Sequence, residues 1–265
     1  GINDALATTL AACGDVNRNV MAPPTPARNG VATAVLDGAR TVSQALMPQT
    51  KAYHQIWVEG VKLKLDDSDY VDPLYGKTYL PRKFKVAFVT PPLNDTDVLT
   101  NCMGFIAIEE NGELIGYNLT AGGGMGMTHN NAATYPRVAD VVGFFRPEHL
   151  EAVSKAVLTV HRDFGDRTNR RHARLKYVLA ERGVEWFRGE VEQRAGIKLE
   201  EARPFEFERQ GDLFGWHEAA DGSWFLGLHV LSGLVKDGLK IALREIVETH
   251  RPEVRLTPSQ NLLLC

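Results

Sequence analysis

Two lysines separated by one residue carry the clearest chemical signal in this sequence. Lys83 and Lys85 follow the pair Pro81-Arg82. In a strand, residues two apart point to the same side, so the spacing predicts that both ammonium groups lie together while Arg82 points the other way. Two partly desolvated cations on one side attract an anion strongly. The alternative is a solvated edge strand, on which lysines protect against aggregation.

A second candidate is the polar stretch from Gly14 to Val20, which reads Gly-Asp-Val-Asn-Arg-Asn-Val. We predict a loop here, with fixed donors that can face a ligand and with Arg18 as its cation. The alternative is ordinary turn chemistry in which Arg18 forms a salt bridge.

A glycine-rich run, residues 122–126, follows a predicted strand and reads Gly-Gly-Gly-Met-Gly. A backbone cradle for phosphate is one interpretation. The spacing matches neither the dinucleotide fingerprint nor the P-loop, so the nucleotide interpretation is weak. Close approach of Gly123 and Gly124 to a large cofactor fits equally well. His129 follows nearby, but a lone histidine is more often structural than a ligand.

Arginines then recur at the spacing i, i+3, i+4 and i+7. They are Arg167, Arg170, Arg171 and Arg174. This spacing predicts one helix over Arg167–Arg182 with a basic face. Like charges this dense repel, so the face indicates acidic side chains, cofactor carboxylates or nucleic acid as partners. The alternative is local pairing with Asp163, Asp166 and Glu181.

The overall composition excludes several classes of protein. The chain has 265 residues, of which 44% are hydrophobic and 24% charged, with a net charge of -3. A disordered or low-complexity chain is thereby excluded. The apolar runs are shorter than the roughly 18–20 residues of a membrane helix, so we expect no membrane partner. Aromatic residues do not interleave with the basic ones and no RNA-binding motif occurs, so we expect no nucleic acid.

The three cysteines, Cys13, Cys102 and Cys265, form no CxxC pair. A disulfide scaffold and a structural zinc site are therefore disfavoured, no metal site is expected within the chain, and a reducing cytoplasmic setting fits. Three thiols also cannot supply the four ligands of an iron–sulfur cluster.

Helical periodicity and Pro or Gly punctuation predict the elements that must position these residues. Helices are expected over 31–46, 147–161 and 184–195, and a strand over 84–90. The dipeptide Asn111-Gly112 predicts a hairpin between strands 105–108 and 114–119. Strands and helices that do not alternate strictly indicate an α+β fold, a mixed sheet with packed helices.

Beyond Arg203-Pro204 the pattern changes to strand 213–218, strand 224–230, helix 240–249 and strand 254–257. This β-β-α-β order predicts half of a ferredoxin-like module, so we expect two domains, 1–203 and 204–265. The chain stops in an apolar run that is typical of a buried strand. We expect a piece of a longer protein; the alternative is a terminal strand that docks into its sheet.

Taken in order, five motifs resemble the sirohaem-containing assimilatory sulfite reductase family. They are residues Ala11–Met21, Tyr79–Lys85, Gly122–Met127, Arg167–Tyr177 and Arg255–Asn261. The residues of several segments are more similar to those of the ferredoxin-type enzymes than to those of the NADPH-dependent haemoprotein subunit. That preference rests on Val20–Pro23, Gly124–Gly126 and Leu213–Glu218.

The resemblance implies reduction of sulfite to sulfide by six electrons at a sirohaem bridged to a 4Fe-4S cluster, with ferredoxin or a flavoprotein as electron donor. It implies that Arg18, Lys83 and Lys85 bind sulfite and help to deliver protons. Residues implied in cofactor binding are Arg82, Arg170, Arg171, Arg174, Gly123, Gly124, Gln260 and Asn261. Related enzymes on the same fold reduce nitrite to ammonia.

The chain also departs from the family pattern. The family's cluster cysteines follow the Gln260-Asn261 motif, and a further active-site arginine belongs to the first half of the ferredoxin-like module. Neither occurs here, so we expect this piece to be inactive alone. The alternatives are a nitrite reductase of the same family and a non-enzymatic module that binds an anion or a cofactor.

The cysteine count generates a first prediction. The purified 265-residue chain should contain no stoichiometric iron–sulfur cluster, because a 4Fe-4S cluster needs four ligands and only three thiols are present. Assays for iron and acid-labile sulfide measure this. One equivalent of labile sulfide per cluster iron would contradict it.

Overall fold

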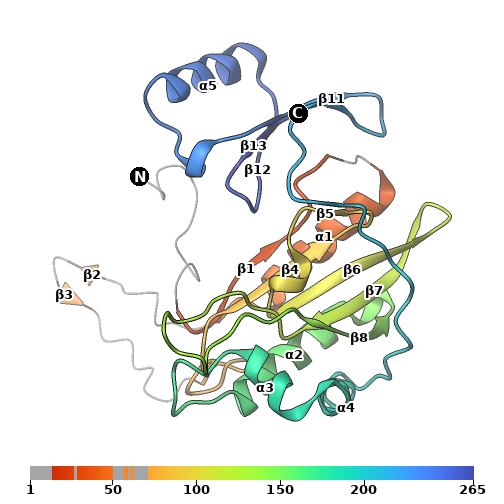
Figure 1. Ribbon diagram of the computed structural model, residues 1–265, viewed down its shortest axis with the longest axis vertical. Helices are drawn as coiled ribbons and strands as arrows, with labels where there is room; N and C mark the ends of the chain where they lie inside the picture. Colours follow the sequence, from red (N-terminus) through yellow and green to blue (C-terminus); the bar gives the residue numbers. More distant parts are fainter. Residues whose placement is uncertain (1–13, 27–28, 50–56, 59–60, 63–70) are drawn as a thin grey trace.

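The strongest apolar runs of the sequence form a mixed sheet of five strands (Figure 1). The computed structural model describes residues 14–26, 29–49, 57–58, 61–62 and 71–265. The strands are β1 (Asn17–Met21), β4 (Phe84–Val89), β6 (Met103–Glu110), β7 (Glu113–Ala121) and β8 (Asp140–Phe145), in the order β1-β4-β6-β7-β8. The β1–β4 and β4–β6 pairs are parallel, whereas β6–β7 and β7–β8 are antiparallel.

The predicted hairpin is confirmed between β6 and β7. Its turn residues Asn111 and Gly112 have φ of 54° and 81°. Both angles lie in the left-handed region that a two-residue hairpin turn requires, and Asn-Gly is the dipeptide that adopts it most readily.

Strand β4, which lies between β1 and β6, shows how the sheet divides the core. Phe84, Val86 and Phe88 belong to the larger apolar cluster, whereas Ala87 and Val89 belong to a second one. Because side chains alternate along a strand, these two sets face opposite sides of the sheet. The sheet is thus buried on both faces, which explains the nearly continuous hydrophobic run.

Helices supply the larger cluster. They are α1 (Gly30–Ala45), α2 (Leu150–Phe164), α3 (Leu175–Arg182) and α4 (Val184–Ala195), and a 3-10 turn, η4 (Pro147–His149), leads into α2. Asn29 begins α1 as an N-cap, since its Oδ1 accepts from the Ala32 amide at 2.7 Å. The predicted bounds of α4 are those observed.

The second cluster is covered by irregular chain. The 3-10 turn η3 (Val98–Thr100) and the extended segment with Phe205 and Phe207 pack against it. Two short strands, β5 (Leu93–Asn94) and β9 (Arg209–Gln210), pair in parallel and fasten this segment to the core. A separate small ladder joins β2 (Trp57–Val58) and β3 (Val61–Lys62).

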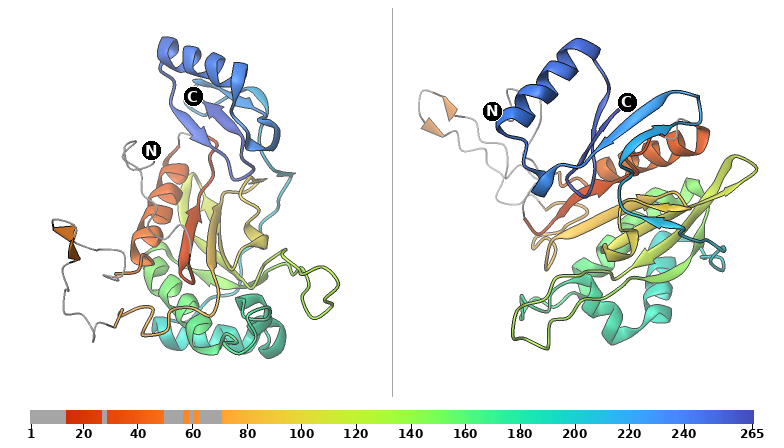
Figure 2. Two further views of the ribbon diagram at one scale, coloured as in Figure 1. Left: turned by 90° about the vertical axis from the view of Figure 1, so that its left-hand side faces the viewer. Right: turned by 45° about the horizontal axis from the view of Figure 1, so that its top comes forward.

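The last 51 residues, from Gly215 to Cys265, form a smaller unit at one end of the molecule (Figures 1 and 2). Its elements are β10 (Gly215–Glu218), β11 (Trp224–Leu228), η5 (Leu231–Gly233), α5 (Asp237–His250), β12 (Val254–Leu256) and β13 (Leu262–Leu264). The sheet order is β10-β11-β13-β12, antiparallel throughout. The predicted β-β-α-β order is therefore present, and the final apolar run docks as β13 between β11 and β12.

Two predictions about local structure are wrong. The expected helix Arg167–Arg182 begins only at Leu175. Before it, Asp166 Oδ1 accepts from the amides of Thr168 and Asn169 at 2.7 and 3.0 Å, so side-chain hydrogen bonds hold turns where the spacing suggested a helix.

The expected polar loop is instead partly a strand, because residues 17–21 pair with β4 as the edge strand β1. The part of its motif that spans Ala11–Cys13 lies outside the described residues. The strand β8 was not predicted at all.

A cavity of about 440 Å³ lies where the smaller unit meets the core. Arg255 from β12 lines it together with core residues, and its Nη1 donates to the Pro24 carbonyl at 3.1 Å. Asp95 also lines it and is 3% exposed. Its Oδ2 accepts from Thr25 Oγ1 at 3.2 Å, whereas Oδ1 has no partner among the described residues. Burial, assisted by the charge of Asp212, raises the pKa of the Asp95 carboxyl to about 7.

This carboxyl makes stability depend on pH. The folded chain keeps a proton on Asp95 that the unfolded chain releases near its ordinary pKa of 3.8, so stability falls as pH rises from about 4 to about 7. Asp95→Asn stays neutral. It should raise the free energy of unfolding above pH 7 by about 1–3 kcal/mol, with a smaller gain at pH 5.

Urea unfolding at pH 5, 6, 7 and 8 measures this difference. Asp97→Asn is the matched control, because Asp97 is exposed two residues away. A gain that is equal at pH 5 and pH 8 would show that the Asp95 carboxyl does not hold a proton in the folded chain.

Candidate functional site

A cleft of about 490 Å³ gathers five of the cations that the sequence singled out, whereas Arg18, Lys85 and Arg167 do not line it. Half of its lining residues are Arg or Lys. The lining comprises Arg82, Lys83, Gly126, Met127, Thr128, Thr134, Arg170, Arg171, Arg174 and Tyr177. These residues come from the segment that leads into β4, from the glycine-rich loop, and from α3 with the turns before it. Segments distant in sequence therefore meet at one basic site, which suits an anionic ligand.

The start of β4 positions the two lysines. Phe84 lies between them, is fully buried and stacks on His161 with ring centroids 5.8 Å apart. Because Phe84 faces the helices, Lys83 and Lys85 emerge on the other side of the sheet. Of the two, only Lys83 lines the cleft, and Arg82, which was expected to point the other way, lines it beside Lys83. Among residues with described placement, neither lysine side chain has a hydrogen bond or an ion pair.

The electrostatics at Lys83 reflect this crowding. Burial is the largest cause that lowers the pKa of the Lys83 ammonium. Neighbouring positive charges lower that pKa further, namely those of Arg18, Lys85, Arg174 and Arg82. A cation held among other cations releases a proton more readily and gains more from a bound anion.

Arg18 reaches this group through an irregularity in β1. Asn17 pairs with Phe84 and Asn19 with Lys85, so Arg18 is an extra residue opposite the beginning of β4. A bulge of this kind turns a side chain away from its ordinary direction. Arg18 Nε donates to the Gly14 carbonyl at 3.0 Å, which holds the guanidinium near the turn.

The predicted cofactor-binding arginines do meet at the cleft, although not on a helical face. Arg170 forms two hydrogen bonds with Asp15, at 2.9 and 3.2 Å, and this carboxylate raises the pKa of the Arg170 guanidinium. Arg171 has no side-chain partner among the described residues. Asp15 is thus the one carboxylate that pairs with a lining cation in the described part of the chain.

Arg174 is half-buried at the cleft. Its Nε is buried without a partner among the described residues, and its Nη2 lies 3.9 Å from Cys102 Sγ. The guanidinium rests on the glycine-rich loop, where a Cβ on Gly124 would lie 3.2 Å from its Cζ and one on Gly126 would lie 3.4 Å from its Nη1. The loop therefore admits a planar guanidinium against its backbone.

Gly123 has a different role. A Cβ there would lie 2.3 Å from the Leu99 carbonyl oxygen and 2.7 Å from that of Asn101. The Gly123 amide also donates to the Asn101 carbonyl at 2.9 Å. Gly123 thus serves close packing of the backbone within the fold, and it does not line the cleft.

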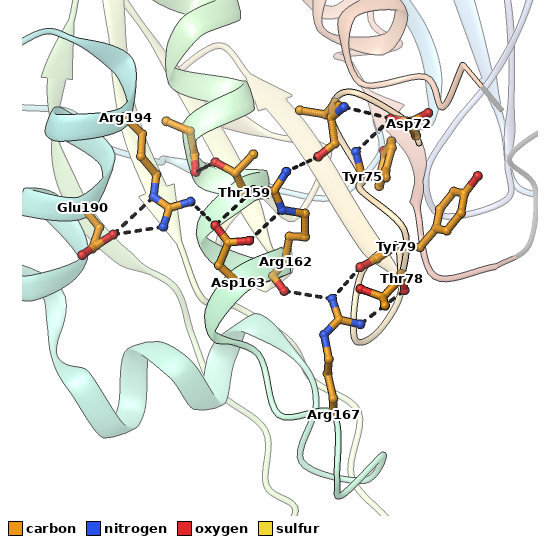
Figure 3. A network of polar contacts seen from close by, with 12 residues as sticks. Asp72, Tyr75, Thr78, Tyr79, Thr159, Arg162, Asp163, Arg167, Glu190 and Arg194 are labelled. Atoms are coloured by element: carbon orange, nitrogen blue, oxygen red, sulfur yellow. Dashed lines mark hydrogen bonds and ion pairs between the residues drawn. The ribbon is translucent and has the colours of Figure 1, made fainter. Parts of the chain in front are cut away.

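Arg167, the first arginine of the predicted face, points elsewhere. It donates to the carbonyls of Tyr79 and Arg162 at 2.6 and 2.9 Å (Figure 3). Figure 3 shows that this arginine joins the end of α2 to the loop before Pro81. Its role is to hold the segment that leads into Lys83.

Gln260 and Asn261 do not line the cleft. Asn261 is buried, its Nδ2 donates to Asp212 at 2.6 Å, and its Oδ1 accepts from the Val230 amide at 2.8 Å. Gln260 is exposed in the turn before β13 and packs against Gly233. Both side chains therefore contact the smaller unit.

Two lining residues were not singled out in the sequence. Thr134 is 4% exposed and its Oγ1 accepts from the Thr128 amide at 2.7 Å, which closes the glycine-rich loop. Tyr177 stacks on His172 with ring centroids 3.7 Å apart. Neither residue type carries a signal of its own, because their placement depends on contacts distant in sequence.

A metal centre is not formed by the described residues, in which no three His, Cys, Asp or Glu side chains gather. Cys102 is buried and Cys265 half-buried. No helix in the described part of the chain is long and apolar enough to cross a membrane.

Comparison with known proteins assigns the chain to a family. The family model described as "Nitrite and sulphite reductase 4Fe-4S domain" matches residues 37–199, and the one described as "Nitrite/Sulfite reductase ferredoxin-like half domain" matches residues 217–265. The chain belongs to the nitrite and sulphite reductase family. The α+β fold predicted from the sequence is confirmed.

Relatives include proteins named "Sulfite reductase [NADPH] hemoprotein beta-component". The protein from Myxococcus xanthus is 53% identical over 99% of this chain and 47% of its own length. The one from Shewanella sp. (strain ANA-3) is 47% identical over the whole chain and 47% of its own length. The chain therefore spans about half the length of these relatives.

A solved structure, that of the Mycobacterium tuberculosis NirA protein, has the same fold. Its TM-score is 0.69 at 23% identity, over 96% of this chain and 41% of that one.

The two roles of glycine lead to a stability prediction. Gly123→Ala should lower the free energy of unfolding by about 1–3 kcal/mol, because the new methyl group would meet two carbonyl oxygens of the backbone. Gly189→Ala in α4 is the control. Nothing lies within 4 Å of a Cβ there, so it should raise stability by about 0.5–1 kcal/mol. Equal effects in chemical unfolding would contradict the packing role of Gly123.

Proposed function

We propose that this chain is the sirohaem- and anion-contacting part of a sulfite reductase. The observation that carries the proposal is the cleft at which Lys83 and four arginines meet, while Asp15 is the only carboxylate among the described residues that pairs with any of them. A polyanionic cofactor and a small dianion together would offset this excess of positive charge. The names of the relatives support sulfite as the anion.

The lining residues fit sirohaem by their donor set. Sirohaem carries many carboxylates, and the guanidinium groups of Arg82, Arg170, Arg171 and Arg174 can bind them as planar forks. The unpartnered Nε of Arg174 is a buried donor of the kind such a carboxylate would satisfy. When bound together with its cluster, sirohaem would provide the iron site for sulfite and pass on the electrons that an external donor supplies.

This chain's own residues bind the anion and handle protons. We assign sulfite binding to Arg18, Lys83 and Lys85, which lie where β1 pairs with the beginning of β4. Each oxygen that leaves sulfite as water takes up protons, so a donor with a lowered pKa is useful. Lys83 is suited to donate from Nζ, since burial and its neighbours already lower its pKa.

The 4Fe-4S cluster must take ligands from outside this chain. The region matched by the family model that is described as a 4Fe-4S domain contains Cys102 alone. We therefore propose that the cluster is completed by another part of a longer protein. We also propose two domains, 1–203 and 204–265, with the chain between Leu199 and β9 as their connection.

The smaller unit gives independent support for a longer protein. Helix α5 has no buried residue, and Ile241 on it is 70% exposed. A family model described as a half domain matches this unit. We propose that a second half-module covers α5 and completes the ferredoxin-like fold.

The electron donor and the compartment are further proposals. Relatives named as beta-components of an NADPH-dependent enzyme favour a flavoprotein donor over ferredoxin. A cytoplasmic location agrees with the low number of cysteines, which form no CxxC pair. Nitrite is the alternative substrate, for which only the shared fold of the NirA protein argues. Competition between sulfite and nitrite in steady-state kinetics distinguishes the two.

The lysine pair gives the central test. In the full-length protein, Lys83→Met and Lys85→Met should each lower sulfite turnover about 10²-fold while sirohaem content stays near that of the wild type. Loss of one of two converging cations removes a few kcal/mol of transition-state stabilisation. Turnover of methyl-viologen-reduced enzyme and the sirohaem absorption spectrum measure the two quantities. Wild-type turnover in both variants would show that the lysine pair takes no part in sulfite reduction.

A second test addresses Arg18. Arg18→Lys should keep the fold and sirohaem but raise the sulfite KM, because lysine cannot form two parallel hydrogen bonds to the anion. Arg18→Ala should raise the sulfite KM further. The control is Arg40→Ala, since Arg40 is an exposed partner of Asp37 on α1 and such a pair contributes about 0–1 kcal/mol. If Arg40→Ala alters the sulfite KM as much as Arg18→Ala does, Arg18 does not bind the anion.

A further inference from the structure

Lys176, the second residue of α3, is the most unusual charged residue of the fold. Its side chain is 1% exposed. Its Nζ donates to the carbonyls of Gly124 at 3.1 Å and Gly126 at 2.8 Å, and also to that of Tyr135. An ammonium has three N–H donors, so all of them are used. Among the described residues no carboxylate pairs with it.

The three carbonyls come from both limbs of one loop. Gly124 and Gly126 lie on the limb that leaves β7, whereas Tyr135 lies on the limb that returns toward β8. The limbs are also joined by reciprocal backbone hydrogen bonds between Gly124 and Arg137, at 2.8 and 3.0 Å. One buried cation on α3 thus fastens the whole base of the loop.

Aromatic rings enclose this ammonium. Nζ lies 5.0 Å from the ring centroid of Tyr177 and 5.8 Å from that of Tyr135, and the two rings meet edge to face. Ring faces stabilise a cation without carrying a charge. Burial is the largest cause that lowers the Lys176 pKa, followed by the charge of Arg174. The site keeps this lysine despite the cost of burying it, which indicates a specific role.

The loop that Lys176 holds is a wall of the cationic cleft. Gly126, Met127, Thr128 and Thr134 line the cleft, and Arg174 rests on Gly124 and Gly126. A shift of the loop would therefore move both the wall and the support beneath the Arg174 guanidinium. Nothing else in the described chain joins α3 to both limbs by side-chain hydrogen bonds.

We propose that Lys176 is a positioning residue that sets the shape of the anion- and cofactor-binding cleft by holding both limbs of the loop at residues 122–137. It does not contact the ligand; it acts through the loop and Arg174. This inference deepens the proposed function and rests on it for the identity of the ligand.

The test compares hydrogen exchange and kinetics in the full-length protein. In Lys176→Met the amides of Gly124, Thr134 and Arg137 should exchange at least 10-fold faster, while those of β4 and β6 keep their rates. The sulfite KM should rise about 10-fold with a smaller change in kcat, because Lys83 and Lys85 remain in place. Lys155→Met is the matched control, since Lys155 is 44% exposed and pairs with Glu151.

Thr134→Val provides a second route to the same loop. It removes the hydrogen bond from the Thr128 amide and leaves no buried cation unpaired. It should accelerate exchange in the loop and raise the sulfite KM, and it keeps the proposal testable if Lys176→Met does not fold.

Three results would overturn the positioning role. They are wild-type loop exchange in Lys176→Met, faster exchange throughout β4 and β6, or faster loop exchange with an unchanged sulfite KM. Failure of the proposed function is recognised separately. In that case Lys83→Met would reduce sulfite like the wild type, while loop exchange would still report whether Lys176 anchors the loop.

Discussion

Mutual repulsion of like charges is the constraint on which this molecule depends. The charges of Arg18 and Arg174 repel that of Lys83 at a partly desolvated site. In a flexible chain these side chains would move apart. The free-energy cost of this repulsion is offset by the burial of the apolar clusters on both faces of the sheet. The cations are held at the edge of a rigid core, so the repulsion remains available for a bound anion to relieve.

The elements predicted well are those whose determinants are local. Asn111-Gly112 fixes its own turn, and α4 ends at Gly196, whose φ of 70° terminates the helix. The predictions failed where contacts between residues distant in sequence determine the local structure. The bulge at Arg18 exists because β1 pairs with a strand more than sixty residues away in the sequence. No periodicity in residues 14–20 indicates this pairing.

In the candidate site, too, the predictions that held depend on local geometry, and those that failed depend on contacts distant in sequence. Spacing alone placed Lys83 and Lys85 on one side, because that follows from strand geometry. The arginines from 170 to 174 do reach the cleft, but through turns held by Asp166 and Asn169 and not along a helical face. Lys176 cannot be distinguished from a surface lysine in the sequence, because its burial among carbonyl groups arises only in the folded chain.

The adjacent glycines 123 and 124 have a consequence for how relatives of this chain are compared. A methyl group at Gly123 would meet backbone oxygens, whereas one at Gly124 would meet the Arg174 guanidinium. Selection would retain glycine at both positions, but for unrelated reasons, one concerned with folding and the other with the site. Strong conservation of glycine at these two alignment columns would therefore look alike, although only at position 124 should the rare departures from glycine accompany a change at position 174.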